Sequence, residues 1–368
     1  MKKILNYTLI SLIILSVVLS FSLVSCKTAA TTETTAAAAA ETTAAQAGSS
    51  DIMARFVAEE IKPSYPTEKN PTTAKEDYVV GLVAYYFADN YCKWLMNEFQ
   101  KYQKAQYPNI TLKVVDGQGA VEPTIAVIEQ FITEQVDAII LQPFDSNAFV
   151  PSVQKALAAG IPIINTNVPI NDNGTTAFVS SDFYREGFAQ GEYMGKVIEN
   201  GAEIAIVKGE PADASNNRRK GVEDSLITKR TDVKLVSEQI AHWRKEEALK
   251  IAEDWVLKFP NLKYILSQSD EMAMGVVEAL RGANKIGEIQ VAAIDGSAQG
   301  CVAVDKGEIL VDIGSNVPLM AQLSLDVAIR ILNGESFDKF IYLPTPAIDK
   351  SNVAEYLQMH KDAGNLEL

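Results

Sequence analysis

Aromatic and neutral polar side chains gather where one buried strand is predicted to end. The segment "YYFADNYCKW" places Tyr85, Tyr86 and Tyr91 beside Asn90, just before a predicted helix. Tyrosine rings combine apolar faces with a polar handle, which suits a ligand ring that is hydroxylated at its edge and carries C–H bonds on its faces. We therefore expect at least one of these tyrosines to face a ligand cleft. The alternative is that some are core residues and that Asp89 or Asn90 caps the helix.

Further polar candidates follow the ends of other predicted strands. The segment "INTNVP" carries Asn167, whose amide can both donate and accept hydrogen bonds. The segment "GEPADASNNRRKG" places Asn216, Arg218 and Arg219 at the start of a helix. An arginine can hold two hydroxyl groups with its planar fork, although a charge run of this kind is more often solvated. The sequence leaves open which of the two arginines contacts a ligand.

Four more candidates complete the predicted site. Ser269, in "QSDEMAMG", stands at a junction between strand and helix, where helix capping is the alternative role. Asp295, in "AIDGSAQG", ends a strand and can accept hydrogen bonds from two adjacent hydroxyl groups. Asn316, in "GSNVP", lies near an expected crossing between lobes, and Trp243 lies in a loop before a helix that starts near Arg244. These residue types favour binding of an uncharged, hydroxyl-rich molecule.

Motifs for catalysis or for metal binding are missing from the sequence. The chain has two histidines, His242 and His360, and contains no HExxH, no GxxxxGK[ST] loop and no GxSxG. We therefore predict that the protein is not an enzyme and that it needs neither a metal nor another cofactor. A secreted sugar-modifying hydrolase, whose carboxylate pair only folding would bring together, is the rival hypothesis.

Short β-branched runs alternate with amphipathic stretches from Tyr78 onward, and this alternation defines the expected fold class. The first series of predicted strands is "YVVGLVA", "ITLKVV", "DAIILQ" and "IPIIN", and the second is "EIAIVKG", "VKLVSEQ", "KYILSQ", "QVAAID" and "ILVDI". Between two of them, Ile125, Ile128, Phe131 and Ile132 lie on one helical face. The pattern predicts an α/β fold of two similar lobes with parallel sheets, whose ligands bind beyond the carboxyl ends of the strands.

The N-terminal region is typical of an exported protein. Lys2 and Lys3 precede an apolar run that is short for a membrane span, which predicts a secretory signal over residues 1–25. Leu23 to Cys26 resemble a lipobox, so we expect Cys26 to be acylated and to begin the mature chain. The alternative is that Cys26 is an ordinary residue at the end of a cleaved signal.

A tether and an extension are predicted after the signal. Residues 26–50 are almost entirely Thr, Ala and Glu, which bury too little surface to fold. Residues 51–77 are interpreted as an extension packed loosely on the first lobe. The formal net charge of the chain is −14, which argues against nucleic acid and against anionic lipid as partners.

Several stretches together carry a family resemblance. They are "DAIILQPFDSNAF", "AGIPIINTN", "VSSDFYREGFAQGEYM", "SQSDEMAMGVVEAL", "VAAIDGS" and "KGEILVDIGSNVP". From Tyr78 to about Pro346 the chain resembles the sugar-binding proteins of ABC importers, the ribose-binding-like branch of the type I periplasmic binding proteins. The resemblance implies two Rossmann-like lobes joined by three hinge crossings near Ser181, Asn316 and Leu343. Lobe 1 would comprise residues 78–181 and 317–343, and lobe 2 residues 182–316 and 344–368.

The resemblance also implies roles for individual residues. Stacking positions fall on or near Tyr91 and on Trp243, a ligand-binding carboxylate falls on Asp295, and an amide falls on Asn316. The chain departs from ribose-binding members in three places. Asn167 and Val168 replace an Asp-Arg pair, Ser269 replaces an asparagine, and Asn216 takes the slot of an arginine, with Arg218 two residues further on. These departures argue against ribose itself.

We expect a monomeric, lipid-anchored solute-binding protein that faces the outside of the cytoplasm. It would bind a monosaccharide or small polyol by hinge closure and deliver it to an ABC permease. A second hypothesis keeps the fold but makes the protein a sensor component for a sugar-like signal, such as an autoinducer. The sequence does not separate transport from signalling.

Overall fold

The computed structural model describes residues 73–171 and 174–366. The predicted signal, Cys26, the tether and most of the 51–77 extension lie outside the described residues. The described end of that extension is held by two hydrogen bonds. The Lys75 backbone N–H donates to Asn333 Oδ1 at 3.2 Å, and Asn109 Nδ2 donates to the Glu76 carbonyl at 3.1 Å. Across the described ranges, no helix combines the length and the apolar character needed to cross a bilayer.

The first sheet, sheet A, has six strands within the described residues, in the order β11-β5-β4-β3-β1-β2. Every neighbouring pair in it is parallel. Its strands are β1 (Val79–Ala84), β2 (Thr111–Asp116), β3 (Ala138–Leu141), β4 (Ile163–Thr166), β5 (Ala177–Ser181) and β11 (Phe340–Leu343).

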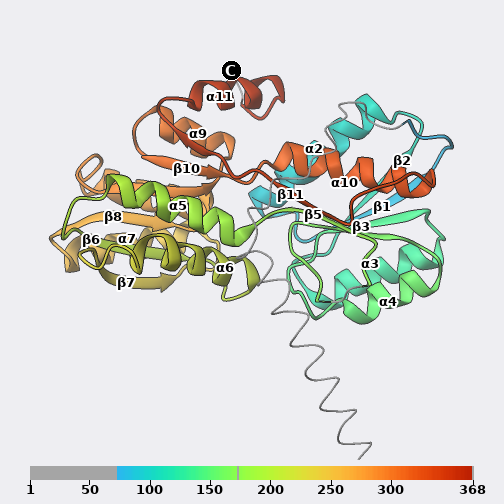
Figure 1. Cartoon of the computed structure of the whole chain (residues 1–368), viewed down its shortest axis with the longest axis horizontal. Coiled ribbons are helices and arrows are strands. Elements are labelled where there is room, and N and C mark those ends of the chain that lie inside the picture. The colour runs from blue at the N-terminus through green and yellow to red at the C-terminus, as the bar shows by residue number, and fades with distance from the viewer. Residues whose placement is uncertain (1–72, 172–173, 367–368) are drawn as a thin grey trace, which may run out of the picture. The chain divides into compact units, whose positions relative to one another are not determined.

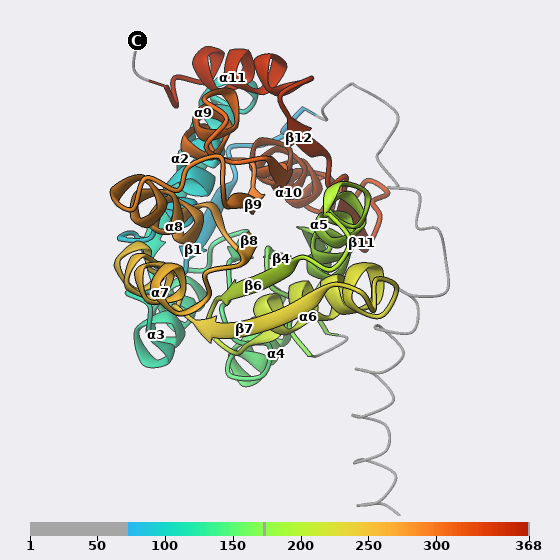
Figure 2. The same cartoon turned by 90° about the vertical axis from the view of Figure 1, so that its left-hand side faces the viewer.

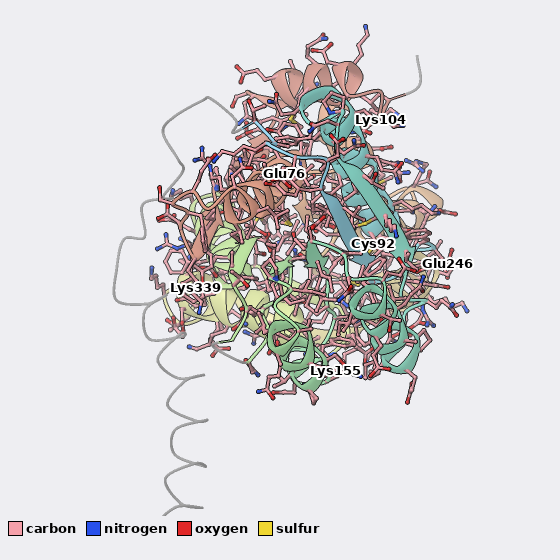
Figure 3. The ribbon with its side chains drawn as sticks, turned by 90° about the vertical axis from the view of Figure 1, so that its right-hand side faces the viewer. Glu76, Cys92, Lys104, Lys155, Glu246 and Lys339 are labelled. Carbon is pink, nitrogen blue, oxygen red and sulfur yellow. The ribbon has the colours of Figure 1, made fainter. Side chains whose placement is uncertain are left out.

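Helices cover both faces of sheet A (Figure 1). One face packs on α2 (Asn90–Gln106) and α10 (Val317–Leu332), and the other on α3 (Val121–Thr133) and α4 (Val150–Ala158). Strand residues alternate between these two cores, so that Leu82 packs on the α2 side and its neighbour Val83 on the α3 side. This explains why the strands are apolar throughout. Lys104 on α2 and Lys155 on α4 point away from the sheet, into solvent (Figure 3).

The second sheet, sheet B, also has six strands within the described residues, in the order β12-β10-β9-β8-β6-β7. Its strands are β6 (Glu203–Lys208), β7 (Lys234–Ile240), β8 (Leu262–Ser267), β9 (Gln290–Asp295), β10 (Val311–Gly314) and β12 (Ala347–Asp349). All of its pairs are parallel except β10 with β12, which is antiparallel.

Sheet B is likewise packed between helices (Figure 2). One face packs on α5 (Phe183–Val197) and on α6 (Asp213–Val222), which continues into the π-helix η1 (Glu223–Ile227). The other face packs on α7 (Lys245–Lys258), α8 (Asp270–Gly282), α9 (Ala298–Asp305) and α11 (Val353–Asp362). The α/β class with two parallel-dominated sheets, predicted from the alternation of strands and helices, is confirmed.

The chain passes between the two sheets three times, and these passages explain the antiparallel strand. The passages lie at Asp182, at Ser315 and Asn316, and at 344–346. In the third, the chain leaves β11 at the carboxyl edge of sheet A and enters sheet B from the edge where its parallel strands end. Because β12 enters from that edge, it must run opposite to β10.

Candidate functional site

A cavity of about 590 Å³ lies where the carboxyl ends of the strands of both sheets converge. Loops that end β1, β4, β6, β7, β8 and β9 contribute to its wall, which is the position expected for a ligand site in open parallel sheets. The lining includes the following candidates from the sequence: Tyr85, Asn90, Tyr91, Asn167, Arg218, Trp243, Ser269 and Asp295.

On the sheet A side, the wall of the cavity consists mainly of aromatic rings and side-chain amide groups. The Tyr91 hydroxyl lies 3.3 Å from Asn167 Oδ1, which joins the start of α2 to the end of β4. The ring of Tyr85 packs against Phe144 with centroids 4.6 Å apart. Asn167 has φ 72°, a backbone conformation that asparagine tolerates better than most residues and that turns the chain at the strand end. Flat rings and a donor–acceptor amide therefore face the cavity from this side.

Arg218 dominates the sheet B side. Its side chain is buried, with Nε donating to Glu186 Oε2 at 2.7 Å and Nη2 to Asp295 Oδ1 at 3.3 Å. Nη1 donates to the carbonyl of Gln268. Burial lowers the pKa of Arg218, but the adjacent Glu186 and Asp295 carboxylates raise it above its ordinary value, so the group stays charged.

Two aromatic rings enclose the guanidinium of Arg218. Its Cζ lies 5.4 Å from the ring centroid of Phe183 and 5.7 Å from that of Trp243, distances at which cation–π attraction operates. Trp243 follows His242 in a turn where both residues have positive φ, 49° and 61°. The indole lies directly over Gly209, where an added Cβ would be 2.1 Å from the ring. The position of Trp243 is therefore fixed by the backbone turn it forms with His242, by its contact with Gly209 and by its cation–π contact with Arg218.

Asp295 connects the arginine to the N-terminus of α8. Its Oδ2 accepts from the Asp270 backbone N–H at 3.1 Å while its Oδ1 accepts from Arg218. The residue has φ 144°, an unusual value for a non-glycine residue that is maintained by these contacts. Burial raises the pKa of Asp295 well above its ordinary value, and Arg218 opposes that shift.

Asp270 and Asp312 form a buried carboxyl pair behind Asp295. Oδ2 of Asp270 accepts from the Ser297 N–H at 2.7 Å, and Oδ1 of Asp312 accepts from the Gly296 N–H at 3.0 Å. Burial is the main cause that raises the pKa of both groups, that of Asp312 to about 7. Among the residues described, no group of three histidine, cysteine, aspartate or glutamate side chains is arranged to hold a metal ion.

Direct contacts join the two sides of the cavity at its edges. Asn90 Nδ2 donates to Glu271 Oε2 at 2.8 Å, and the Ser146 hydroxyl donates to Asp213. The C-terminal segment reaches α2, where Asn365 Nδ2 donates to Glu98 Oε1 at 2.8 Å. These contacts tie elements that flank sheet A to elements that flank sheet B.

Three residues predicted for the site do not line this cavity. Tyr86 is 40% exposed and lies over Gly119 instead. Asn216 is exposed on α6, because a residue two positions before Arg218 points about 200° away around a helix. Asn316, with φ 54°, is the N-cap residue directly before α10, and its carbonyl accepts from the Met320 N–H at 3.0 Å.

Two capping alternatives raised by the sequence describe real contacts. Ser269 Oγ accepts from the Met272 N–H at 3.3 Å at the start of α8, and Asp89 Oδ1 accepts from the Cys92 N–H at 2.8 Å at the start of α2.

Sequence reasoning missed Phe183 and Glu186, which contact Arg218. The available signal was their position directly after the strand that leads out of sheet A, inside the stretch "SSDFYREG".

Two α/β lobes that place a lined cavity between their strand ends define a solute-binding protein of the periplasmic type. The sequence model of the family described as "Periplasmic binding protein domain" matches residues 80–336, and the chain belongs to this family. The family consists of solute-binding proteins rather than enzymes and acts outside the cytoplasm. The family resemblance seen in the sequence is therefore confirmed.

Three similar proteins illustrate what such relatives bind. A D-ribose/D-allose-binding protein of Pseudomonas aeruginosa is 29% identical over 238 residues, covering 63% of this chain and 71% of that protein. A xylitol-binding protein of Mycolicibacterium smegmatis is 28% identical over 255 residues, covering 68% of this chain and 72% of that protein. The crystal structure of an ABC transporter solute binding protein from Bacillus halodurans with bound myo-inositol has a TM-score of 0.72 and 27% identity, covering 78% of this chain and 99% of that one.

Proposed function

We propose that this protein is the substrate-binding component of an ABC importer and that it captures a monosaccharide or small polyol in the cavity. The observation that carries the proposal is the chemistry of the wall, which pairs flat rings with an anchored arginine and aspartate at the strand ends. Relatives that bind D-ribose, D-allose, xylitol and myo-inositol support the same ligand class.

The ligand would be held by both lobes at once. Tyr91 and Trp243 supply apolar ring surfaces, while Asn167, Arg218 and Asp295 supply donors and acceptors for hydroxyl groups. A ligand that contacts both sides favours the closed arrangement over an open one, because only contacts made in both lobes shift that equilibrium. We assign residues 78–181 and 317–343 to lobe 1, and residues 182–316 and 344–368 to lobe 2, with hinges at the three passages between the sheets.

We also propose that the mature protein is a monomer moored to a membrane by acylation of Cys26, with residues 26–50 as its tether. The lipobox-like residues Leu23 to Cys26 support this assignment. Metabolic labelling with a palmitate analogue in a bacterial host tests it. Label that enters the wild type but not Cys26→Ser supports the anchor, and equal labelling of the two contradicts it.

Thermal-shift screening against aldoses, ketoses and polyols tests the transport ligand. A compound that binds only the folded protein raises the melting temperature by mass action, so D-ribose, D-allose, xylitol and myo-inositol come first in the panel. Isothermal titration then confirms a hit. An Asp295→Ala variant serves as the site control, because removing charged hydrogen bonds weakens binding by about 1.5 to 3 kcal/mol each. A hit whose affinity is unchanged in that variant contradicts the assigned site.

A further inference from the structure

Glu186 is a fully buried carboxylate that does not line the cavity, yet both of its oxygens are engaged. Oε2 accepts from Arg218 Nε at 2.7 Å, and Oε1 accepts from the Ser315 hydroxyl at 2.7 Å. Ser315 lies on the second passage between the sheets, two residues before the start of α10. Glu186 thus connects the arginine of the site to a segment where the chain changes lobes.

Close packing of two helices places this carboxylate. A Cβ on Gly187 of α5 would lie 1.9 Å from the Arg218 carbonyl oxygen, and a Cβ on Gly221 of α6 would lie 2.2 Å from the Tyr184 carbonyl oxygen. The two glycines therefore let the helix backbones touch. At that distance Glu186 reaches Nε of Arg218, and this contact helps to orient the guanidinium.

The contacts of Arg218 fix which of its hydrogen-bond donors remain for a ligand. Of its five N–H groups, one binds Glu186, one binds the Gln268 carbonyl and one binds Asp295. The guanidinium carbon also lies over the rings of Phe183 and Trp243. Two N–H groups remain beyond these three contacts, and because Arg218 lines the cavity, we assign them to hydroxyl oxygens of a ligand.

The same contacts set the charge around Arg218, while Asp89, Glu210, Asp270 and Glu271 add carboxyl groups elsewhere in the lining. Two carboxylates, Glu186 and Asp295, accompany one guanidinium, so the triad is negative or neutral but not positive while Glu186 is ionised. Lys93 and Arg244, the other lysine and arginine of the lining, are exposed and therefore screened by water and salt. A carboxylated or phosphorylated ligand would leave water without meeting a compensating buried cation.

We infer that Glu186 is a positioning and selectivity residue: it orients Arg218 and cancels its charge, so that the cavity accepts uncharged polyols and rejects their anionic counterparts. This inference rests on the proposed function, since it concerns the same cavity and the same ligand class. Two substitutions separate its two parts. Glu186→Gln keeps the shape of the side chain and removes its charge, while Glu186→Asp keeps the charge and withdraws it from Nε.

Isothermal titration with matched probes provides the test. The pairs are D-galactose with D-galacturonate, D-glucose with D-glucuronate, D-ribose with D-ribonate, and xylitol with D-xylonate. In the wild type, the carboxylate of a pair should bind at least about 100-fold more weakly than its neutral partner, because burying an unpaired charge is costly. In Glu186→Gln that ratio should narrow by about tenfold or more, and the neutral probe should also bind more weakly, since Arg218 loses its orienting acceptor.

The other variants make the result specific. Glu186→Asp should bind the neutral probe more weakly but keep the wild-type ratio. Glu223→Gln is the matched control, because Glu223 pairs with Arg219 at 2.7 Å on the outer side of the same helix region and should change neither value. Circular dichroism establishes that each variant is folded. If Glu186→Gln does not fold, the wild-type ratio and the Glu186→Asp affinity still decide the question.

The outcomes distinguish this inference from the proposed function. If the wild type binds neither the neutral probes nor any other neutral sugar or polyol of the wider screen, the proposed function and this inference are both overturned. A wild type that binds a neutral probe and its carboxylate equally overturns the inference alone. So does a Glu186→Gln variant with the wild-type ratio, or a Glu186→Asp variant with the wild-type affinity.

Discussion

The carboxyl groups of Asp270 and Asp312 converge on one point above Gly300, where an added Cβ would lie 2.3 Å from Oδ2 of each. Both side chains are buried, 3% and 0% exposed. Two carboxylates this close and this dry are not both ionised, so the pair shares a proton at neutral pH. Because Asp270 lines the cavity beside Ser269, the protonation of this pair affects the wall of the site directly.

Replacing Asp312 by asparagine should change how stability depends on pH. An aspartate has an ordinary pKa of 3.8, and burial raises the pKa of Asp312 to about 7. Protonation of Asp312 therefore stabilises the folded state fully below about pH 4, and this contribution is lost as the pH rises through about 7, while the remaining proton stays on the pair. Asp312→Asn keeps a neutral hydrogen-bonding group at every pH. We expect the variant to be more stable than the wild type at pH 8, by about 1 to 3 kcal/mol, with a smaller gain at pH 5.

Urea denaturation at pH 5 and pH 8 measures this difference. Asp254→Asn, at an exposed position on α7, is the control and should follow the wild type at both pH values. An Asp312→Asn variant whose stability changes with pH as steeply as that of the wild type would show that the ionisation of Asp312 is not the cause of the pH dependence.

Removing the arginine of the site should destabilise the protein as well as abolish binding. Arg218→Met keeps much of the side-chain volume but leaves Glu186 and Asp295 buried without their cation. Breaking a buried ion pair from one side costs about 3 to 5 kcal/mol. Arg281→Met is the comparison, since Arg281 is 55% exposed in its pair with Glu308 and surface pairs contribute about 1 kcal/mol or less. Equal free energies of unfolding in the two variants would contradict the buried network.

The strand residues show what the sequence could predict. Ile139, Ile140 and Leu141 form a short apolar run between helical patterns, and such a run is stable only when both of its faces are covered. The α/β class follows from repeating that pattern. In contrast, β12 is three residues long and takes its direction from the passage out of β11, which no local pattern encodes.

The site was predictable only in part, for a similar reason. Strand ends identify Asp295 and Asn167, because the edge where parallel strands end is common to all of them. The partner of Arg218 could not be found this way. Glu186 lies in the first turn of α5, where an acidic residue is ordinarily explained by the helix dipole, and only the contact between α5 and α6 turns it inward. Likewise, only the helical geometry of α6 shows that Arg218 lines the cavity while Asn216 is exposed.

The glycine beneath Trp243 gives a test of the aromatic wall that leaves the tryptophan itself intact. In Gly209→Ala the added methyl group would lie 2.1 Å from the indole, so the ring must move away from its place beside Arg218. We expect ligand affinity to fall about tenfold or more, because the ring would no longer present its apolar face to the cavity at its present position. Gly195→Ala is the control, since the nearest atom to a Cβ there is 3.8 Å away and alanine suits a helix interior. Titration with the ligand from the thermal-shift screen measures both, and an unchanged affinity in Gly209→Ala would remove Trp243 from the site.

The hydrogen bond between Asn90 and Glu271 should slow ligand release. It joins the start of α2 to the start of α8 at 2.8 Å, on opposite sides of the cavity, so it exists only while the two lobes are together. Both groups are partly solvated, and such a contact contributes about 0.5 to 1 kcal/mol. In Asn90→Ala we expect the dissociation rate of the ligand to rise about two- to fivefold with little change in the association rate. Stopped-flow measurement of tryptophan fluorescence is suited to this, since Trp243 lines the cavity.

The double variant Asn90→Ala/Glu271→Ala completes a thermodynamic cycle. If the bond itself is the cause, the double variant releases ligand no faster than the quicker single variant, whereas rates that multiply would show that the two residues act independently.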